Sequence, residues 1–182
     1  MTVKNNISIY KKYDIILERL SLDRLELLRN WRNDPKISQY MGSKEYITPE
    51  MHMNWFNKIN NDNNYHFIVI YNNEAIGSVN IKDINYEKKC GEPGIFIYED
   101  KYLNSDVGFR MALCNTDFAF DYLKLEYLYG IILADNKRAI RFNNALGYLP
   151  DKIQKYSEKI SCTLTKERYF EYRNKILNLF PK

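Results

Sequence analysis

The sequence predicts an α/β fold in which helices cover a mixed β-sheet. One observation is a pair of β-rich runs, Tyr65–Tyr71 and Ala75–Ile84, joined across Asn72-Asn73-Glu74, which predicts an antiparallel hairpin. The other is the alternation of strand-like and helix-like segments that follows, which is typical of strand–helix–strand units. Antiparallel strands followed by such units indicate a sheet that contains both kinds of pairing.

The segment before the hairpin predicts one strand and two helices. Asp14–Leu20 has the composition of a strand, and Leu22–Asn33 places apolar residues on one helical face. Pro35 opposes a continuation of that helix, because its ring disfavours helical geometry at the preceding residue. Thr48-Pro49-Glu50 combines a hydroxyl N-cap, a proline at the first helical position and an acid in the first turn, which predicts a second helix start.

The segment after the hairpin predicts strands and helices in alternation. Gly147 is expected to end one of these helices in a left-handed conformation. In chain order the expected elements are a short strand at Gly94–Tyr98, a long helix at Val107–Leu123, a buried strand at Tyr127–Leu133, an amphipathic helix around Ala139–Leu146, strand signals at Lys152–Leu164 and a helix at Lys166–Leu179.

Composition and charge favour a single domain, residues 1–182, of a soluble protein. No repeat or Gly/Pro/Ser-rich linker divides the chain, and the longest nearly unbroken apolar run, Tyr127–Ala134, is far shorter than the roughly 20 residues that cross a bilayer. Met1–Tyr13 is polar and lacks an apolar signal core, so a cytoplasmic location is expected. The net charge of +4 suits an acidic ligand but is too diffuse for nucleic acid.

The cysteines predict neither a metal site nor a disulfide framework. Cys90, Cys114 and Cys162 are widely separated, and His52 and His66 do not complete a ligand spacing. We therefore expect three reduced and mostly buried thiols, and no metal. The expected partner is a small-molecule substrate, with no nucleic acid and no membrane, and a homodimer stays open.

The strongest motif is Asn136–Tyr148, with the sequence Asn-Lys-Arg-Ala-Ile-Arg-Phe-Asn-Asn-Ala-Leu-Gly-Tyr after a buried strand. An ordinary amphipathic helix would explain its apolar face and Gly147, but not the first Asn or the closing aromatic. The motif resembles the pattern of the GNAT superfamily of N-acetyltransferases. Upstream, Gly94–Tyr98, a short loop and the helix at Val107 resemble the acyl-CoA strand and pyrophosphate loop of that superfamily. The resemblance implies a three-layer helix/mixed sheet/helix fold and acetyl-CoA as co-substrate.

The implied cofactor site has a direct physical basis. A helix N-terminus offers unpaired N–H groups and a partial positive charge, which suit a pyrophosphate. The preceding strand can hydrogen-bond the pantetheine amides as though they were a neighbouring strand. Through the resemblance, the cofactor-binding residues are Phe96, Ile97, Tyr98, Leu103, Asn104, Ser105, Asp106, Val107, Gly108, Phe109, Asn136 and Phe142.

The loop departs from the family pattern Gln/Arg-x-x-Gly-x-Gly/Ala. Aligned on Gly108, Leu103 stands at the Gln/Arg position and Asp106 at the first glycine. An aspartate beside a pyrophosphate is unfavourable unless its side chain turns away or caps the helix. Weak binding of CoA is one expected consequence of this departure.

The N-terminal half indicates which members of the GNAT superfamily the sequence resembles. Asn30–Pro35, Gln39–Met41 and Thr48–Phe56 resemble the acceptor-side helices of N-acetyltransferases that modify nucleotide-linked 4-amino sugars, as in the pseudaminic-acid pathway. Ribosomal-protein N-terminal acetyltransferases carry related versions, and Leu164–Arg168 is similar to theirs. The substrate-binding residues implied are Trp31, Arg32, Met41, His52 and Trp55.

Each acceptor-side residue also has a structural interpretation. Trp31 and Trp55 would otherwise be core or lid aromatics rather than walls for a sugar or uracil ring. Arg32 would form a surface ion pair rather than bind a substrate phosphate. His52, which lies on an apolar stripe, would be a hydrogen-bonded structural histidine.

Acetylation of an amine needs a base and a polarised carbonyl. A backbone N–H from Phe96–Tyr98 is the expected oxyanion donor. Glu92 matches an acidic position near the start of the family's acyl-CoA strand and is the first candidate base, although a plain loop or salt-bridging carboxylate is the alternative. His52 is the second candidate. The family's usual acid, a tyrosine after Phe142, is replaced here by Asn143, and Tyr148 is expected to be a packed aromatic.

Three functions remain open at this point. The first is acetylation of an amino sugar, and the second is acetylation of protein or peptide N-termini. The third is a catalytically inactive binding module with this fold, which the altered loop and the missing tyrosine suggest.

Overall fold

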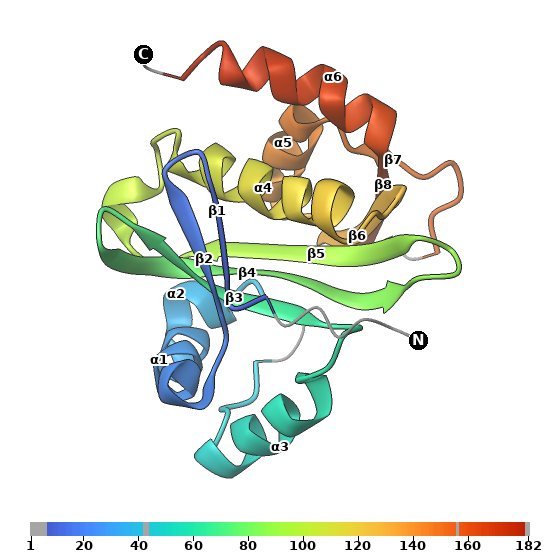
Figure 1. The fold of residues 1–182 in the computed structure, drawn as a ribbon. Coiled ribbons are helices and arrows are strands. Elements are labelled where there is room, and N and C mark those ends of the chain that lie inside the picture. Colours follow the sequence, from blue (N-terminus) through green and yellow to red (C-terminus); the bar gives the residue numbers. More distant parts are fainter. Residues whose placement is uncertain (1–6, 42–43, 156, 181–182) are drawn as a thin grey trace.

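The computed structural model describes residues 7–41, 44–155 and 157–180. Within them, the strands form one eight-stranded sheet in the order β1-β2-β3-β4-β5-β6-β8-β7. Helices α1, α2 and α3 lie against one face of the sheet, and α4, α5 and α6 lie against the other (Figure 1). The predicted three-layer arrangement of a mixed sheet between helices is therefore confirmed.

The first half of the chain supplies the antiparallel part of the sheet and the helices of one face. Its elements are β1 (Ile9–Lys12), β2 (Ile15–Arg19), α1 (Leu22–Asn33), α2 (Pro35–Ser38), α3 (Pro49–Ile59), β3 (Tyr65–Tyr71), β4 (Glu74–Asn85) and β5 (Cys90–Ile97).

The second half supplies the other face and the far edge of the sheet. After a 3₁₀ turn at Asp100–Tyr102 come α4 (Val107–Asp117), a π-helical turn at Phe118–Tyr122, β6 (Tyr127–Leu133), α5 (Lys137–Leu146), β7 (Leu149–Pro150), β8 (Lys159–Thr165) and α6 (Lys166–Leu177).

Local chemistry explains where the predicted helices begin and end. The Thr48 side chain accepts a hydrogen bond from the Met51 N–H, and Pro49 occupies the first position of α3. Gly147 ends α5 with a φ of 98°, a conformation that costs little only for glycine.

The structure differs from the sequence prediction in three places. The polar segment Ile9–Lys12 forms β1, because Tyr13 and Asp14 both adopt positive φ and turn the chain back onto β2. Helix α1 ends at Asn33 before Pro35, as predicted, but Pro35 also starts a short helix, α2, that was not expected, with the Asp34 side chain capping the Lys36 N–H. The strand expected from residue 152 begins only at Lys159.

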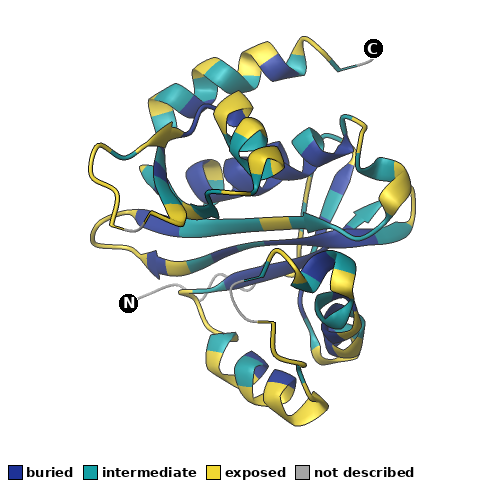
Figure 2. Cartoon of the chain, turned by 180° about the vertical axis from the view of Figure 1, so that it is seen from behind, coloured by how far each residue is buried: buried dark blue, intermediate teal, exposed yellow. Residues whose placement is uncertain are grey.

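The core is divided by the sheet into two layers, and buried residues follow both faces of the strands (Figure 2). The larger cluster packs α4 and α6 against the sheet and includes Phe67, Met111 and Phe118. The smaller cluster packs α1 and α3 against the opposite face and includes Trp31 and Phe56.

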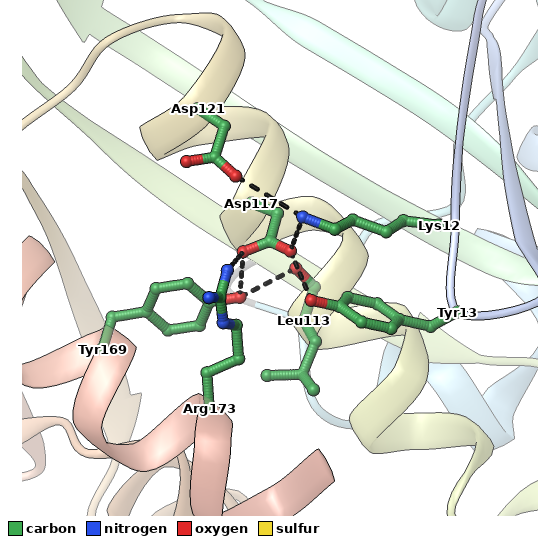
Figure 3. Close-up of polar contacts among 7 residues, drawn as sticks. All are labelled: Lys12, Tyr13, Leu113, Asp117, Asp121, Tyr169 and Arg173. Carbon is green, nitrogen blue, oxygen red and sulfur yellow. Dashed lines mark hydrogen bonds and ion pairs between the residues drawn. The ribbon is translucent and has the colours of Figure 1, made fainter.

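A buried carboxylate ties the two ends of the chain to α4 (Figure 3). Asp117 is fully buried and accepts hydrogen bonds from the hydroxyl groups of Tyr13 at 2.5 Å and Tyr169 at 2.6 Å. Lys12 Nζ lies 2.5 Å and Arg173 Nη1 3.1 Å from the same carboxylate. The β1–β2 turn and α6 therefore both contact the carboxylate on α4, and these contacts compensate the removal of its charge from water.

We expect Asp117→Ala to lower the free energy of unfolding by about 3–5 kcal/mol, because it removes the shared acceptor of the buried Tyr169 hydroxyl, the Tyr13 hydroxyl and two partly exposed cations. Asp121→Ala is the control, since Asp121 is partly exposed and pairs with Lys12 at 3.4 Å. Its cost should stay below about 1 kcal/mol. Urea denaturation of the two variants checks this, and equal losses would contradict a special role for Asp117.

Candidate active site

A gap between two parallel strands lies at the centre of the candidate site. β5 and β6 pair only at Cys90–Tyr127 and Gly91–Leu128. Beyond that point, the amide of Tyr98 donates to Ile76 on β4 at 2.8 Å. Because amides of alternate residues face opposite sides of a strand, the amides of Ile95 and Ile97 face the gap. The open edge of β5 therefore offers donors to an extended ligand.

The loop between β5 and α4 lies beside this gap. Arg138 on α5 donates to the carbonyl of Leu103, and Ser105 Oγ accepts from the Val107 N–H at 3.3 Å. The following N–H groups belong to the first turn of α4, which has no intrahelical acceptor for them. This helix start has the geometry and partial charge that suit an anion.

Asp106 turns away from the helix start instead of capping it. Its side chain makes no cap hydrogen bond and lies 2.7 Å from Arg110 Nε. Arg110 Nη1 also binds Asp14 in the β1–β2 turn at 2.7 Å. Of the two possibilities left by the sequence, the structure shows the first, and the carboxylate is neutralised by its own helix.

Side chains from α4 and α5 cover the same end of β5. The rings of Phe109 and Phe142 lie 4.9 Å apart. A Cβ added at Gly108 would lie 3.4 Å from Ile97 Cδ1 and 3.7 Å from the Phe142 ring. The Asn136 side chain caps α5 by accepting from the Ala139 N–H, so its oxygen is already engaged.

On the opposite face of the sheet, side chains from α1, α3 and β3 form the acceptor-side cluster, which we define as Arg32, His52, Trp55 and His66. The rings of His52 and Trp55 are stacked 4.8 Å apart, and His66 contacts Trp55 edge-on at 5.0 Å. The Arg32 guanidinium lies 5.2 Å from the Trp55 ring centre. Three of the five predicted acceptor-side residues, Arg32, His52 and Trp55, therefore lie together, and His66 joins them at the Trp55 indole.

Arg32 is a partly buried cation without an anion. Among the described residues it makes no ion pair or hydrogen bond, and its contact with Trp55 is a cation–π interaction. Burial lowers the pKa of Arg32, which shows that its surroundings disfavour the charge. Such a guanidinium is suited to a carboxylate or phosphate brought by a ligand.

A family model described as an acetyltransferase (GNAT) domain matches residues 14–148. The chain belongs to this GNAT family. Acetyltransferase PseH of Campylobacter jejuni is 29% identical over 124 residues, covering 67% of this chain and 74% of PseH, and the protein matches in two strains. The family predicted from the Asn136–Tyr148 motif is confirmed, and the chain is an N-acetyltransferase by family.

Solved structures share the GNAT fold at low sequence identity. Spermidine N-acetyltransferase from Vibrio cholerae, in complex with CoA and spermine, gives a TM-score of 0.78 at 18% identity and covers 87% of this chain and 99% of that one. FdhC, described as a nucleotide-linked sugar GNAT, gives 0.77 at 20% identity and covers 95% and 98%. These likenesses support the fold.

The two histidines of the acceptor-side cluster are neutral at pH 7. Burial and the guanidinium of Arg32 lower the pKa of His52 to about 4 and that of His66 to about 3. His52 is 1% exposed, and among the described residues its ring nitrogens have only a poorly aligned contact with the backbone of Leu25. So low a pKa makes it a weak base, and its role stays a prediction.

Glu92 lies inside β5 rather than in a loop. Its carboxylate is 3.1 Å from Lys82 Nζ on β4, and its side chain is 24% exposed. Lys82 and Glu92 are directly opposite in the ladder and share the face of the acceptor-side cluster. The salt bridge expected as the alternative is therefore present, and the role of Glu92 as base stays a prediction.

Two predicted contacts are corrected by the structure. Trp31 is 5% exposed and stacks on Tyr98 at 5.2 Å, so it belongs to the core rather than to a substrate wall. Tyr98 cannot serve as an amide donor to a ligand, because its N–H is bound to Ile76, and its hydroxyl donates to Asp34 at 3.1 Å. Met41 follows α2, with its amide bound to Ser38.

The acid side of the reaction has no tyrosine at the family position. Asn143 Nδ2 donates to the Ala139 carbonyl at 2.9 Å, which anchors it to its own helix. Tyr148 is 5% exposed, and burial raises the pKa of its phenol. It is a packed aromatic, as expected.

Sequence reasoning did not assign His66 and Asn80 to the site. His66 interrupts an otherwise apolar and aromatic strand, and this contrast is the signal that could have found it, whereas β4 alternates polar and apolar residues and gives no such signal for Asn80. Within the described residues no group of metal-ligating side chains gathers, and no helix is long and apolar enough to cross a bilayer.

We expect stability to fall as the pH drops from about 6.5 to 5. The unfolded chain binds protons at histidines of pKa about 6.5, whereas the folded chain holds His52 and His66 neutral, so the free energy of unfolding rises with pH in this window. The slope should reach up to about 1.4 kcal/mol per pH unit for each histidine. Chemical denaturation at several pH values measures it, and a flat profile would contradict the buried, neutral state.

Proposed function

We propose that this chain transfers the acetyl group of acetyl-CoA to a primary amine on a nucleotide-linked amino sugar. The observation that carries the proposal is Arg32, a partly buried guanidinium on the acceptor side with no anion among the described residues. An acceptor that carries a diphosphate would supply the missing charge. The similarity to FdhC, a nucleotide-linked sugar GNAT, supports the same class of acceptor.

The residues around the strand gap fit a CoA molecule. The amides of Ile95 and Ile97 are directed into the gap, and the start of α4 offers N–H groups beside it. Asp106 does not oppose an anion there, because Arg110 neutralises it. Bound acetyl-CoA would supply an activated thioester. The residues proposed to hold it are those of β5, the following loop, α4 and α5 that the family resemblance implied.

The charges around the acceptor-side cluster disfavour a polyamine as acceptor. The pKa of His66 is lowered first by burial and then by Arg32, Arg19 and Lys82. Lys82 is paired with Glu92, whereas Arg32 has no anion among the described residues, so its charge would repel a polycation at this cluster. The likeness to spermidine N-acetyltransferase therefore supports the fold and does not transfer the substrate.

The proposed chemistry divides between two strands. Glu92 accepts the proton that the amine loses, while Lys82, 3.1 Å away, holds the carboxylate in place. The Ile95 N–H, which faces the gap three residues from Glu92, is the donor placed to stabilise charge on the carbonyl oxygen of the acetyl group. Asn143 donates no proton as an acid, so water or another residue protonates the departing thiolate.

Arg32→Ala should raise the KM for a nucleotide-linked amino sugar about 10- to 100-fold, because it removes a charge-assisted contact to phosphate. The KM for acetyl-CoA should not change. Arg24→Ala is a matched control on the same helix, since Arg24 already pairs with Glu18 at 3.2 Å.

Steady-state kinetics against nucleotide-linked amino sugars, N-terminal peptides and polyamines decides the acceptor class. Turnover of peptides without turnover of any amino sugar would replace the proposal with a peptide N-acetyltransferase. No turnover, together with no binding of acetyl-CoA in calorimetry, would leave the inactive binding module.

Glu92→Gln should lower kcat about 10²–10⁴-fold at neutral pH, because a positioned base contributes that much. The defect should shrink at high pH, where the amine loses its proton without help, and the KM for acetyl-CoA should barely change. Asp83→Asn is the control, since Asp83 is exposed and 3.8 Å from Lys82. Wild-type kinetics in the Gln variant would remove Glu92 from the mechanism.

A further inference from the structure

Two buried polar atoms on neighbouring strands lack partners. His66 on β3 is 8% exposed, and its Nε2 has no hydrogen-bond partner among the described residues. Asn80 lies directly opposite on β4, and its Oδ1 is likewise buried and without a partner. Residues directly opposite in an antiparallel ladder share a face, so both atoms are on the side of α3.

Such atoms need an explanation, because nearly all buried polar groups in folded proteins are hydrogen-bonded. Leaving one unpaired opposes folding, and here two occur side by side. Ser78, one position along on the same face, shows the usual arrangement: it is 4% exposed and its Oγ donates to the Phe67 carbonyl at 2.8 Å. The backbone of a neighbouring strand thus provides an acceptor for the buried Ser78 hydroxyl, whereas His66 Nε2 and Asn80 Oδ1 have no hydrogen-bond partner among the described residues.

His66 and Asn80 lie between the Trp55 ring of the acceptor-side cluster and the candidate base Glu92. His66 contacts Trp55 of the acceptor-side cluster at 5.0 Å. Asn80 is opposite Gly94 on β5, where an added Cβ would lie 2.6 Å from Asn80 Nδ2, so the bare backbone gives the amide its room. Glu92 is two residues from Gly94 on the same face of the strand.

We infer that His66 and Asn80 bind the acceptor at a hydroxyl group next to its reacting amine, and so select acceptors that carry one. A hydroxyl can donate to Asn80 Oδ1 and at the same time accept from an imidazole N–H. The neutral imidazole suits a neutral group, whereas Arg32 serves the anionic part. The inference rests on the proposed acceptor class, which it deepens.

The test uses His66→Phe and Asn80→Leu, which keep size while removing the polar atoms. His66→Phe also keeps a ring against Trp55. Each should raise the KM for a hydroxyl-bearing nucleotide-linked amino sugar about tenfold, the factor for one lost hydrogen bond. The KM for the matched acceptor that lacks the hydroxyl, and the KM for acetyl-CoA, should stay at wild-type values.

Thermal unfolding without ligand gives a second readout. Removing an unpaired buried polar atom should leave Tm unchanged or raise it, whereas a structural histidine would lower Tm when replaced. Ser78→Ala is the matched control, expected to lower Tm and leave both KM values unchanged, because its hydroxyl is engaged within the protein.

The outcomes separate this inference from the proposed function. A lower Tm for His66→Phe, with an unchanged preference for the hydroxyl-bearing acceptor, would overturn the inference while the acceptor class stands. If no nucleotide-linked amino sugar is turned over, the proposed function fails. The ligand-free Tm still decides the role of the pair: an unchanged or raised Tm supports a ligand-binding role, and a fall overturns it.

Discussion

The separation of β5 from β6 after two paired residues is the constraint on which the rest of the site depends. Pro93 follows the last pair on β5, and its position in the alternation places its nitrogen on the side of β6. A proline has no N–H, so the ladder loses a donor at the first position where it could continue. β6 meanwhile pairs along its full length with β8 on its other edge. The amides of Ile95 and Ile97, which face the gap beyond Pro93, therefore have no strand partner and can bind a ligand.

Both faces of the sheet carry positive charge suited to an anion, and the charge has a different source on each face. On one side Arg110 neutralises Asp106, so the partial positive charge of the α4 start is not cancelled. On the other side Arg32 has no anion among the described residues and is partly buried. The proposed reaction, transfer of the acetyl group from CoA to an amine on a nucleotide-linked sugar, needs to attract two phosphate-bearing molecules, and this distribution of charge suits that need.

Local signals in the sequence predicted much of the fold, and tertiary contacts account for what they missed. Thr48-Pro49 and Gly147 mark helix ends through backbone chemistry that needs no partner. β1 is polar and exists because a tight turn pairs it with β2. Trp31 was assigned to a substrate wall through the family resemblance of Asn30–Pro35, but the helix turns the indole into the core. The pairing of His66 with Asn80 depends on strand register, which spacing alone does not give.

Asp117 and His66 are both buried, and they show how burial of a polar group can serve opposite purposes. Four donors from two parts of the chain, the β1–β2 turn and α6, converge on the Asp117 carboxylate, so its desolvation is compensated within the folded chain. His66 Nε2 and Asn80 Oδ1 are buried without such compensation. Replacing the first by an apolar residue removes the centre of a network, whereas replacing either of the second pair removes only a cost. Stability should therefore fall in one case and hold in the other, and this difference separates a polar group kept for the fold from one kept for a substrate.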